Sequence, residues 1–122
     1  MKRDMDLIRK VLFALEGREA DIGDTLSIEG YSMAEVAYHC SLLHDAGYVR
    51  GYKGFYASNE LHYFGVGSLT WDGVEYLEKI RNENVWKKTK EIIIGKGLPL
   101  GIDVIKSVAS SVISEMIRNA LQ

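Results

Sequence analysis

The chain has few of the residues that cross-link a protein, interrupt its helices or anchor it in a membrane. Among its 122 residues there is one cysteine, Cys40, and one proline, Pro99. A single cysteine excludes an intramolecular disulfide and is typical of a protein that folds in a reducing compartment. The charged first residues, MKRDMDLIRK, lack the apolar core of a signal peptide, and no apolar run is long enough to cross a bilayer. We therefore expect a cytoplasmic protein with no membrane segment.

The chain also lacks a strong charge of either sign. Its formal net charge is −2 and its pI is about 5.9, so the bulk charge gives no sign of a strongly basic nucleic-acid binder. The first third is acidic, whereas the segments after residue 47 are mildly basic. Apolar residues make up 47% and charged residues 26%. This balance and length predict one globular domain, or a small core with an extension.

The first helix is expected over residues 4–16. Asp4 is a suitable N-cap and Gly17 a suitable stop. Between them, the apolar residues recur at the spacing of one helix face: Ile8, Val11, Leu12 and Leu15. The segment 18–30 that follows is polar and turn-like, with a short strand candidate at Thr25–Ile28.

The second helix, residues 33–46, has the clearest ends. Ser32 and Glu35 match a capping box, and Gly47 fits the left-handed position that terminates many helices. The spacing places two sets of residues on opposite faces. The expected core face holds Met33, Val36, Cys40 and Leu43, and the expected outward face holds Glu35, Tyr38, His39 and Leu42.

Residues 48–69 are rich in Tyr, Phe and Val and predict two antiparallel strands. Turns are available at Lys53-Gly54 and at Ser58-Asn59. Three more helices are expected after the strands: 71–81 capped by Thr70, 85–94 capped by Asn84, and 102–121. In the first of these we expect Trp71, Val74 and Leu77 to be core residues.

Two motifs carry a resemblance to a known fold. LLHDAGYV, residues 42–49, ends a helix at Gly47, and LTWDGVEYL, residues 69–77, begins another at Thr70. Helix, short strand, helix, hairpin and helix in this order resemble the winged-helix fold, an α+β architecture, over about residues 4–82. The resemblance implies a winged-helix-like domain at 1–82 and a two-helix C-terminal extension at 83–122.

The whole chain also resembles a family of small uncharacterised proteins from bacterial and prophage genomes. The opening MKRDMDLIRK, the block GYSMAEVAYHCSLLHDAG and the block LTWDGVEYLEKIR followed by VWKKTK carry this likeness. It implies a winged-helix-like domain in a mobile-element context, and it implies no particular activity.

Two functions stay open at this stage. A winged helix binds double-stranded DNA with its recognition helix in the major groove and its wing on the backbone. Arg50 and Lys53 would then contact phosphate from the wing, and Tyr38 and His39 would lie nearest the bases. The predicted function is therefore that of a DNA-binding or regulatory accessory protein of a phage or mobile element. The alternative is a protein–protein interaction module on the same scaffold without DNA binding.

The last helix predicts self-association. It is long and apolar, and winged-helix proteins commonly dimerise through terminal helices, so a homodimer is expected. The residues expected at its interface share one side of the helix: Ile105, Val108, Val112 and Met116. The opposing hypothesis is that the last helices fold back on their own core.

The sequence predicts no enzyme, metal site or cofactor. Cys40 and His44 share a helix face, but a zinc site needs three or four convergent ligands. A cysteine on a core stripe is more often a small buried hydrophobe, and a buried thiol is unreactive. The glycines of residues 51–67 suit strands and turns and do not match a phosphate loop that enters a helix.

Overall fold

The computed structural model describes residues 1–19 and 25–122. The described elements are α1 (Met5–Leu15), α2 (Met33–Asp45), β1 (Tyr52–Ala57), β2 (Glu60–Val66), α3 (Trp71–Ile80), α4 (Glu83–Gly95) and α5 (Ile102–Ala120). Five helices and one antiparallel hairpin in this part of the chain confirm the expected α+β layout. The chain divides into two compact units, Met1–Val74 and Glu75–Gln122, and the division falls inside α3.

Local signals account for the ends of the first two helices. The Asp4 carboxylate accepts hydrogen bonds from the backbone N–H groups of Asp6 and Leu7, so it caps α1 as predicted. The capping box of Ser32 and Glu35 begins α2. The predicted stripe of α1 is buried in full: Ile8, Val11, Leu12 and Leu15.

A Schellman motif ends α2. Gly47 has a φ of +82°, and its N–H donates to the carbonyl of His44 at 3.0 Å. The N–H of Tyr48 donates to the carbonyl of Leu43 at 2.8 Å. This pair of bonds satisfies carbonyl groups that a helix end leaves without partners, and it needs a left-handed residue that glycine adopts without strain. The predicted stop at Gly47 is therefore confirmed.

Between α1 and α2, the strand candidate at Thr25–Ile28 was wrong. These residues form no strand, and the sheet in the described residues contains only β1 and β2. A strand needs a neighbour for its backbone bonds, and here the chain turns instead. Gly30, with a φ of +87°, lies in a turn closed by the N–H of Tyr31 on the carbonyl of Ile28 at 3.2 Å. The rest of the expected turn-like segment, residues 20–24, lies outside the described residues.

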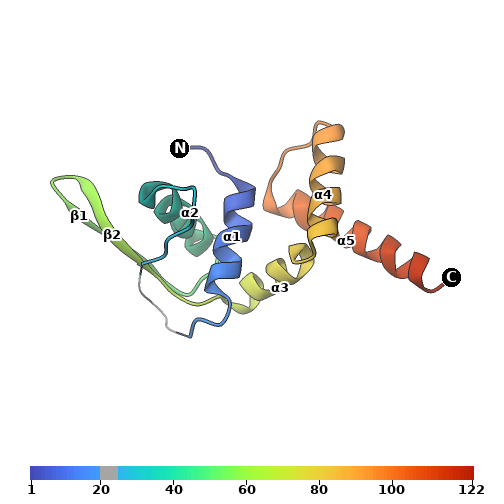
Figure 1. Cartoon of the computed structure of the whole chain (residues 1–122), viewed down its shortest axis with the longest axis horizontal. Helices are drawn as coiled ribbons and strands as arrows, with labels where there is room; N and C mark the ends of the chain where they lie inside the picture. The colour runs from blue at the N-terminus through green and yellow to red at the C-terminus, as the bar shows by residue number, and fades with distance from the viewer. Residues whose placement is uncertain (20–24) are drawn as a thin grey trace. The chain divides into compact units, whose positions relative to one another are not determined.

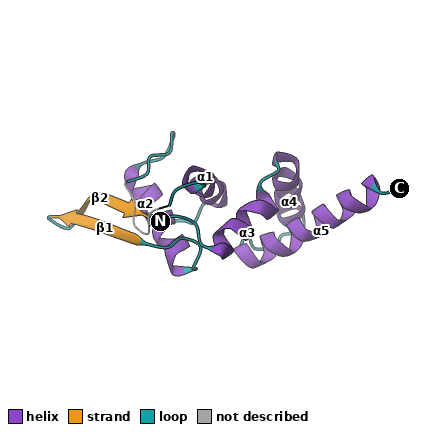
Figure 2. Cartoon of the chain, turned by 90° about the horizontal axis from the view of Figure 1, so that it is seen from below, coloured by secondary structure: helices purple, strands orange, loops and turns teal. Residues whose placement is uncertain are grey.

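The hairpin turns at Ser58-Asn59, and the alternative turn at Lys53-Gly54 was wrong. Both turn residues have positive φ, 52° and 65°, which is the backbone of a type I′ turn. Lys53 and Gly54 instead lie within β1, paired with β2. The register is regular until Phe55 faces Tyr63, where an irregularity places one extra residue, His62, in β2. Within the first unit the hairpin projects away from α1 and α2 (Figures 1 and 2).

In the second unit, α4 packs against α5. The predicted cap at Asn84 was wrong by two positions, because the Asn82 side chain accepts from the N–H of Val85 at 3.0 Å and begins the helix. A capping side chain reaches the N–H two or three residues ahead, and Asn84 already lies inside the first turn. The buried side chains of this unit are Tyr76, Leu77, Ile80, Val85, Trp86, Thr89, Ile93, Ile105, Ala109 and Val112.

Candidate nucleic-acid interface

The base of the hairpin is fixed to the end of α2 by Thr70. Its hydroxyl donates to the carbonyl of Gly47 at 2.6 Å and accepts from the N–H of Gly73 at 3.1 Å, and its N–H donates to the carbonyl of Tyr48 at 3.1 Å. The Arg50 N–H donates to the carbonyl of Ser68 at 2.8 Å. Thr70 therefore caps α3 and joins the two ends of the hairpin to each other. The backbone of Arg50 is held at this junction by its bond to Ser68.

An open depression of about 620 Å³ lies where α2 meets the hairpin. Its lining is His44, Gly47, Val49, Arg50, Gly51, Tyr52 and Thr70. The side chains of Arg50 and His44 are exposed. Burial, and then the neighbouring Tyr56 and Cys40, raise the pKa of Tyr52, so this phenol stays neutral. A permanent guanidinium, an imidazole and a neutral hydroxyl are groups that donate hydrogen bonds to phosphate oxygens.

Lys53 lies further along β1. Its side chain is exposed, and its ammonium lies 5.3 Å from the centre of the Phe55 ring. The Phe55 ring stacks on Tyr63 across the hairpin, with 4.4 Å between centroids and 6° between planes. Arg50 and Lys53, the two predicted phosphate contacts, are therefore both exposed on the same hairpin.

The predicted outward orientation of His39 was wrong. Its side chain is 1% exposed. Its Nε2 accepts the N–H of Asp4 at 2.8 Å, so Nδ1 carries the proton and donates to the carbonyl of Glu35 at 2.7 Å. His39 thus holds the start of α1 and is not available to a ligand. Tyr38 is half-buried, with its ring edge-on to the His39 imidazole at 5.4 Å.

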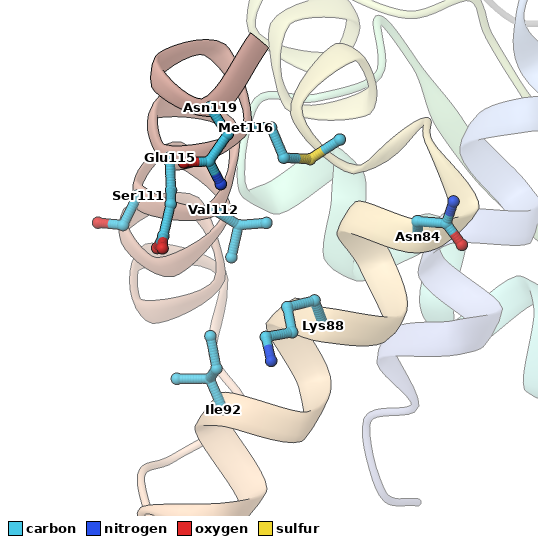
Figure 3. Close-up of a pocket in the computed structure, with 8 residues that line it drawn as sticks. All are labelled: Asn84, Lys88, Ile92, Ser111, Val112, Glu115, Met116 and Asn119. Carbon is cyan, nitrogen blue, oxygen red and sulfur yellow. The ribbon is translucent and has the colours of Figure 1, made fainter. Parts of the chain in front are cut away.

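Of the four residues predicted at a dimer interface, two are covered by the chain itself. Ile105 and Val112 are buried, Val108 is half-buried, and Met116 is 47% exposed. Figure 3 shows Val112 and Met116 of α5 on the side that faces Lys88 and Ile92 of α4. These residues belong to a groove of about 430 Å³, which is lined by Asn84, Lys88, Ile92, Ser111, Val112, Glu115, Met116 and Asn119.

Cys40 is fully buried, and burial raises the pKa of its thiol to about 12. The thiolate is the nucleophilic form and the metal-binding form, so this cysteine is unreactive in the folded chain. His44 lies exposed at the end of α2. No cluster of three or more potential metal ligands occurs within residues 1–19 and 25–122.

The sequence-based prediction missed an exposed tryptophan. Trp71 is 76% exposed and Val74 is 41% exposed, so placing them in the core was wrong, whereas Leu77 is buried as predicted. The buried residues of α3 include Gly73, Tyr76, Leu77 and Ile80. Their spacing of i, i+3, i+4 and i+7 is a better match to one helix face than the predicted set, and it could have shown that Trp71 faces solvent.

Comparison with known proteins gives a family. The family model described as "Hypothetical protein (DUF2513)" matches residues 2–99. The chain belongs to the DUF2513 family. A relative in Haemophilus influenzae, titled "Uncharacterized protein", is 40% identical over 119 residues, covering 96% of this chain and 99% of the relative. This DUF2513 member has no match among solved structures. None of its described helices combines the length and apolarity needed to cross a bilayer.

Proposed function

We propose that this DUF2513 protein binds double-stranded DNA through a winged-helix-type unit, Met1–Val74. The observation that supports this most is the joint exposure of Arg50 and Lys53 on one hairpin, with Arg50 and His44 lining the same depression. A projecting hairpin that follows a helix has the arrangement of a wing. Phosphate neutralisation by Lys and Arg supplies most of the affinity of sequence-independent DNA binding.

The proposed contacts are mainly to phosphate. α2 contains no Lys or Arg between Met33 and Asp45, and base edges in the major groove are read mostly by Arg, Lys, Asn and Gln. With His39 buried, Tyr38 is the side chain that we assign nearest the bases. Binding is therefore expected to depend steeply on salt and weakly on sequence. The role that we propose for this binding is that of a regulatory accessory protein in the cytoplasm, in the phage or mobile-element context that the resemblance of the chain implies.

The test is fluorescence anisotropy of labelled random duplex DNA at low salt and at about 150 mM salt. Wild type is compared with the double variant Arg50→Ala, Lys53→Ala. The matched control is Lys96→Ala, Arg118→Ala, which removes one lysine and one arginine, both exposed, from the helical unit. Both double variants have the same net charge.

We expect wild type to bind at low salt and to weaken as salt rises. The hairpin variant should lose about ten-fold or more in affinity and show a shallower salt dependence, since each lost phosphate contact reduces the slope by about one. The control should bind like wild type. Equal losses in the two double variants would contradict the hairpin assignment, and absence of binding at low salt would contradict DNA binding itself.

We propose as the alternative function a protein-interaction module that self-associates, which the exposed apolar side chains at the end of α5 support. Large apolar side chains are exposed in the last turns of α5 and at its C-cap: Met116, Ile117 and the C-cap Leu121, the last 82% exposed. Apolar side chains that recur on one helix face are typical of contacts with another chain. Sedimentation analysis of wild type and of Ile117→Lys shows whether each protein is a dimer or a monomer. A dimer that dissociates in the variant supports a homodimer through α5, and a monomeric wild type contradicts it.

A further inference from the structure

The hairpin carries a column of stacked groups on one face. Lys53 lies over the Phe55 ring, and Phe55 stacks on Tyr63 with nearly parallel planes, 6° apart. Because strand residues alternate between faces, Lys53 and Phe55 lie on the same face of β1. Their cross-strand partners in β2, Gly65 and Tyr63, lie on that face as well. The column therefore joins an ammonium group to two aromatic rings.

The other face of the hairpin supplies the core contacts. Phe64 is fully buried, and Tyr52 stacks on it with ring centroids 6.0 Å apart. In contrast, Tyr63 is 47% exposed and Phe55 is half-buried. The cross-strand pair helps to stabilise the hairpin, but one ring face is enough for that contact. In the described residues, the second face of Tyr63 has no ring or cation stacked on it.

We propose that this column is a stacking platform for the unpaired bases of single-stranded nucleic acid. The inference rests on the proposed function and deepens it, because Arg50 and Lys53, on the neighbouring strand side of the column, would contact phosphates of other nucleotides in the same bound strand. Every nucleobase has a π-face that stacks on an aromatic side chain, and a nearby cation tracks the backbone.

The charge around the column favours this occupant. β1 contains no carboxylate, and the one acidic residue of β2 is Glu60, beside the turn. Lys53 places a positive charge over the Phe55 ring, at the other end of the column from the exposed face of Tyr63, where it would attract the phosphates of a strand that crosses the hairpin. A column of this kind requires no cavity, which agrees with its position on a projecting hairpin.

The experiment uses the full chain and two probes: a labelled oligothymidine of about 20 nucleotides and a random duplex labelled in the same way. The test variant is Tyr63→Ile, which removes the ring and keeps a residue with high strand propensity. The matched control is Tyr63→Phe, which keeps the ring and loses only the hydroxyl. Far-UV circular dichroism checks that each variant is folded.

We expect Tyr63→Ile to weaken binding of the oligothymidine by about ten-fold, in the range for loss of one base–aromatic stack. Tyr63→Phe should bind it like wild type, and duplex binding should change by less than about two-fold in both variants, because phosphate contacts provide it. If Tyr63→Ile does not fold, Tyr63→Trp replaces it and should bind the oligothymidine more tightly.

Failure of the stacking platform and failure of the proposed DNA binding give different results with the two probes. Duplex binding without a ring-dependent effect on the oligothymidine would overturn the stacking platform and leave the proposed DNA binding in place. Equal losses on both probes in Tyr63→Ile would also overturn it, because they would indicate a general change in the hairpin. Binding of neither probe at low salt would overturn both proposals together.

Discussion

Replacing Gly73 by alanine tests how closely α3 approaches the end of α2. A Cβ atom at position 73 would lie 2.1 Å from the carbonyl oxygen of Tyr48 and 3.1 Å from its carbonyl carbon. Both atoms belong to the backbone, so no side-chain rotation relieves the overlap. The first turn of α3 would have to move away from Tyr48 by about an ångström, because non-bonded carbon and oxygen atoms need more than about 3 Å.

Two opposing contributions set the magnitude. The displacement strains the bond from the Thr70 N–H to the Tyr48 carbonyl and the bond from the Thr70 hydroxyl to Gly47, each worth about 1 kcal/mol. Overpacking adds about 1–3 kcal/mol. Alanine in place of glycine favours the helix by about 1 kcal/mol. The free energy of unfolding should therefore fall by about 2–4 kcal/mol, which lowers the Tm by roughly 10 °C in a chain of this size.

The assay is thermal and urea unfolding followed by circular dichroism. Gly95→Ala is the matched control, because Gly95 also lies in a helix and a Cβ there meets nothing within 4 Å. That variant should keep the stability of wild type or gain up to about 1 kcal/mol. If Gly73→Ala were as stable as Gly95→Ala, the close approach to Tyr48 would be refuted, and so would the requirement for glycine in the LTWDG motif.

Three further predictions concern the helix cap and the buried thiol. Asn82→Ala should lower the free energy of unfolding by about 1 kcal/mol through loss of the cap of α4, whereas Asn84→Ala, two residues on, should cost less than about 0.5 kcal/mol; equal effects in urea titrations would contradict the cap assignment. Alkylation of Cys40 by iodoacetamide should occur only as the chain unfolds in urea, and rapid labelling of the native protein would show that the thiol is accessible. The Cys40 thiol has its ordinary pKa of 9.0 in the unfolded chain and a pKa of about 12 in the folded chain, so the unfolded state binds fewer protons between these pH values. The free energy of unfolding should therefore fall with rising pH in this window, by at most ~1.4 kcal/mol per pH unit. Subtracting the same pH series measured on Cys40→Ala isolates this contribution, and identical pH profiles for the two proteins would contradict it.

The features that sequence predicted correctly are those fixed by neighbours along the chain. The capping box at Ser32, the glycine stop at Gly47 and the Thr70 cap each depend on atoms within a few residues, so their local spacing was enough. The turn at Ser58-Asn59 belongs to the same class, because positive φ is a property of the turn itself. The α+β layout followed from these boundaries.

The features that sequence predicted wrongly depend on contacts between distant residues. His39 is buried and accepts the N–H of Asp4, 35 positions away, whereas helical spacing alone placed it on the outward face. Thr25–Ile28 has suitable residues for a strand, but it pairs with no other strand in the part of the chain that the structure describes. Arg50 and Lys53 are exposed, as contacts to phosphate require. The stack of Phe55 on Tyr63 could not be predicted, because it depends on the register of the hairpin. A turn at Lys53-Gly54, which the sequence also allowed, would have given a different register.

The hydrogen bond between Asp4 and His39 has a consequence for the order of folding during synthesis. α1 is made before α2, but it has only 11 residues, and an isolated helix of that length is marginal in water. Its N-cap residue, Asp4, is held by the side chain of His39, which is synthesised later, in the middle of α2. The hairpin, by contrast, closes through a two-residue turn on a microsecond timescale. The start of α1 is therefore expected to become ordered only after α2 has emerged, although α1 is translated before α2.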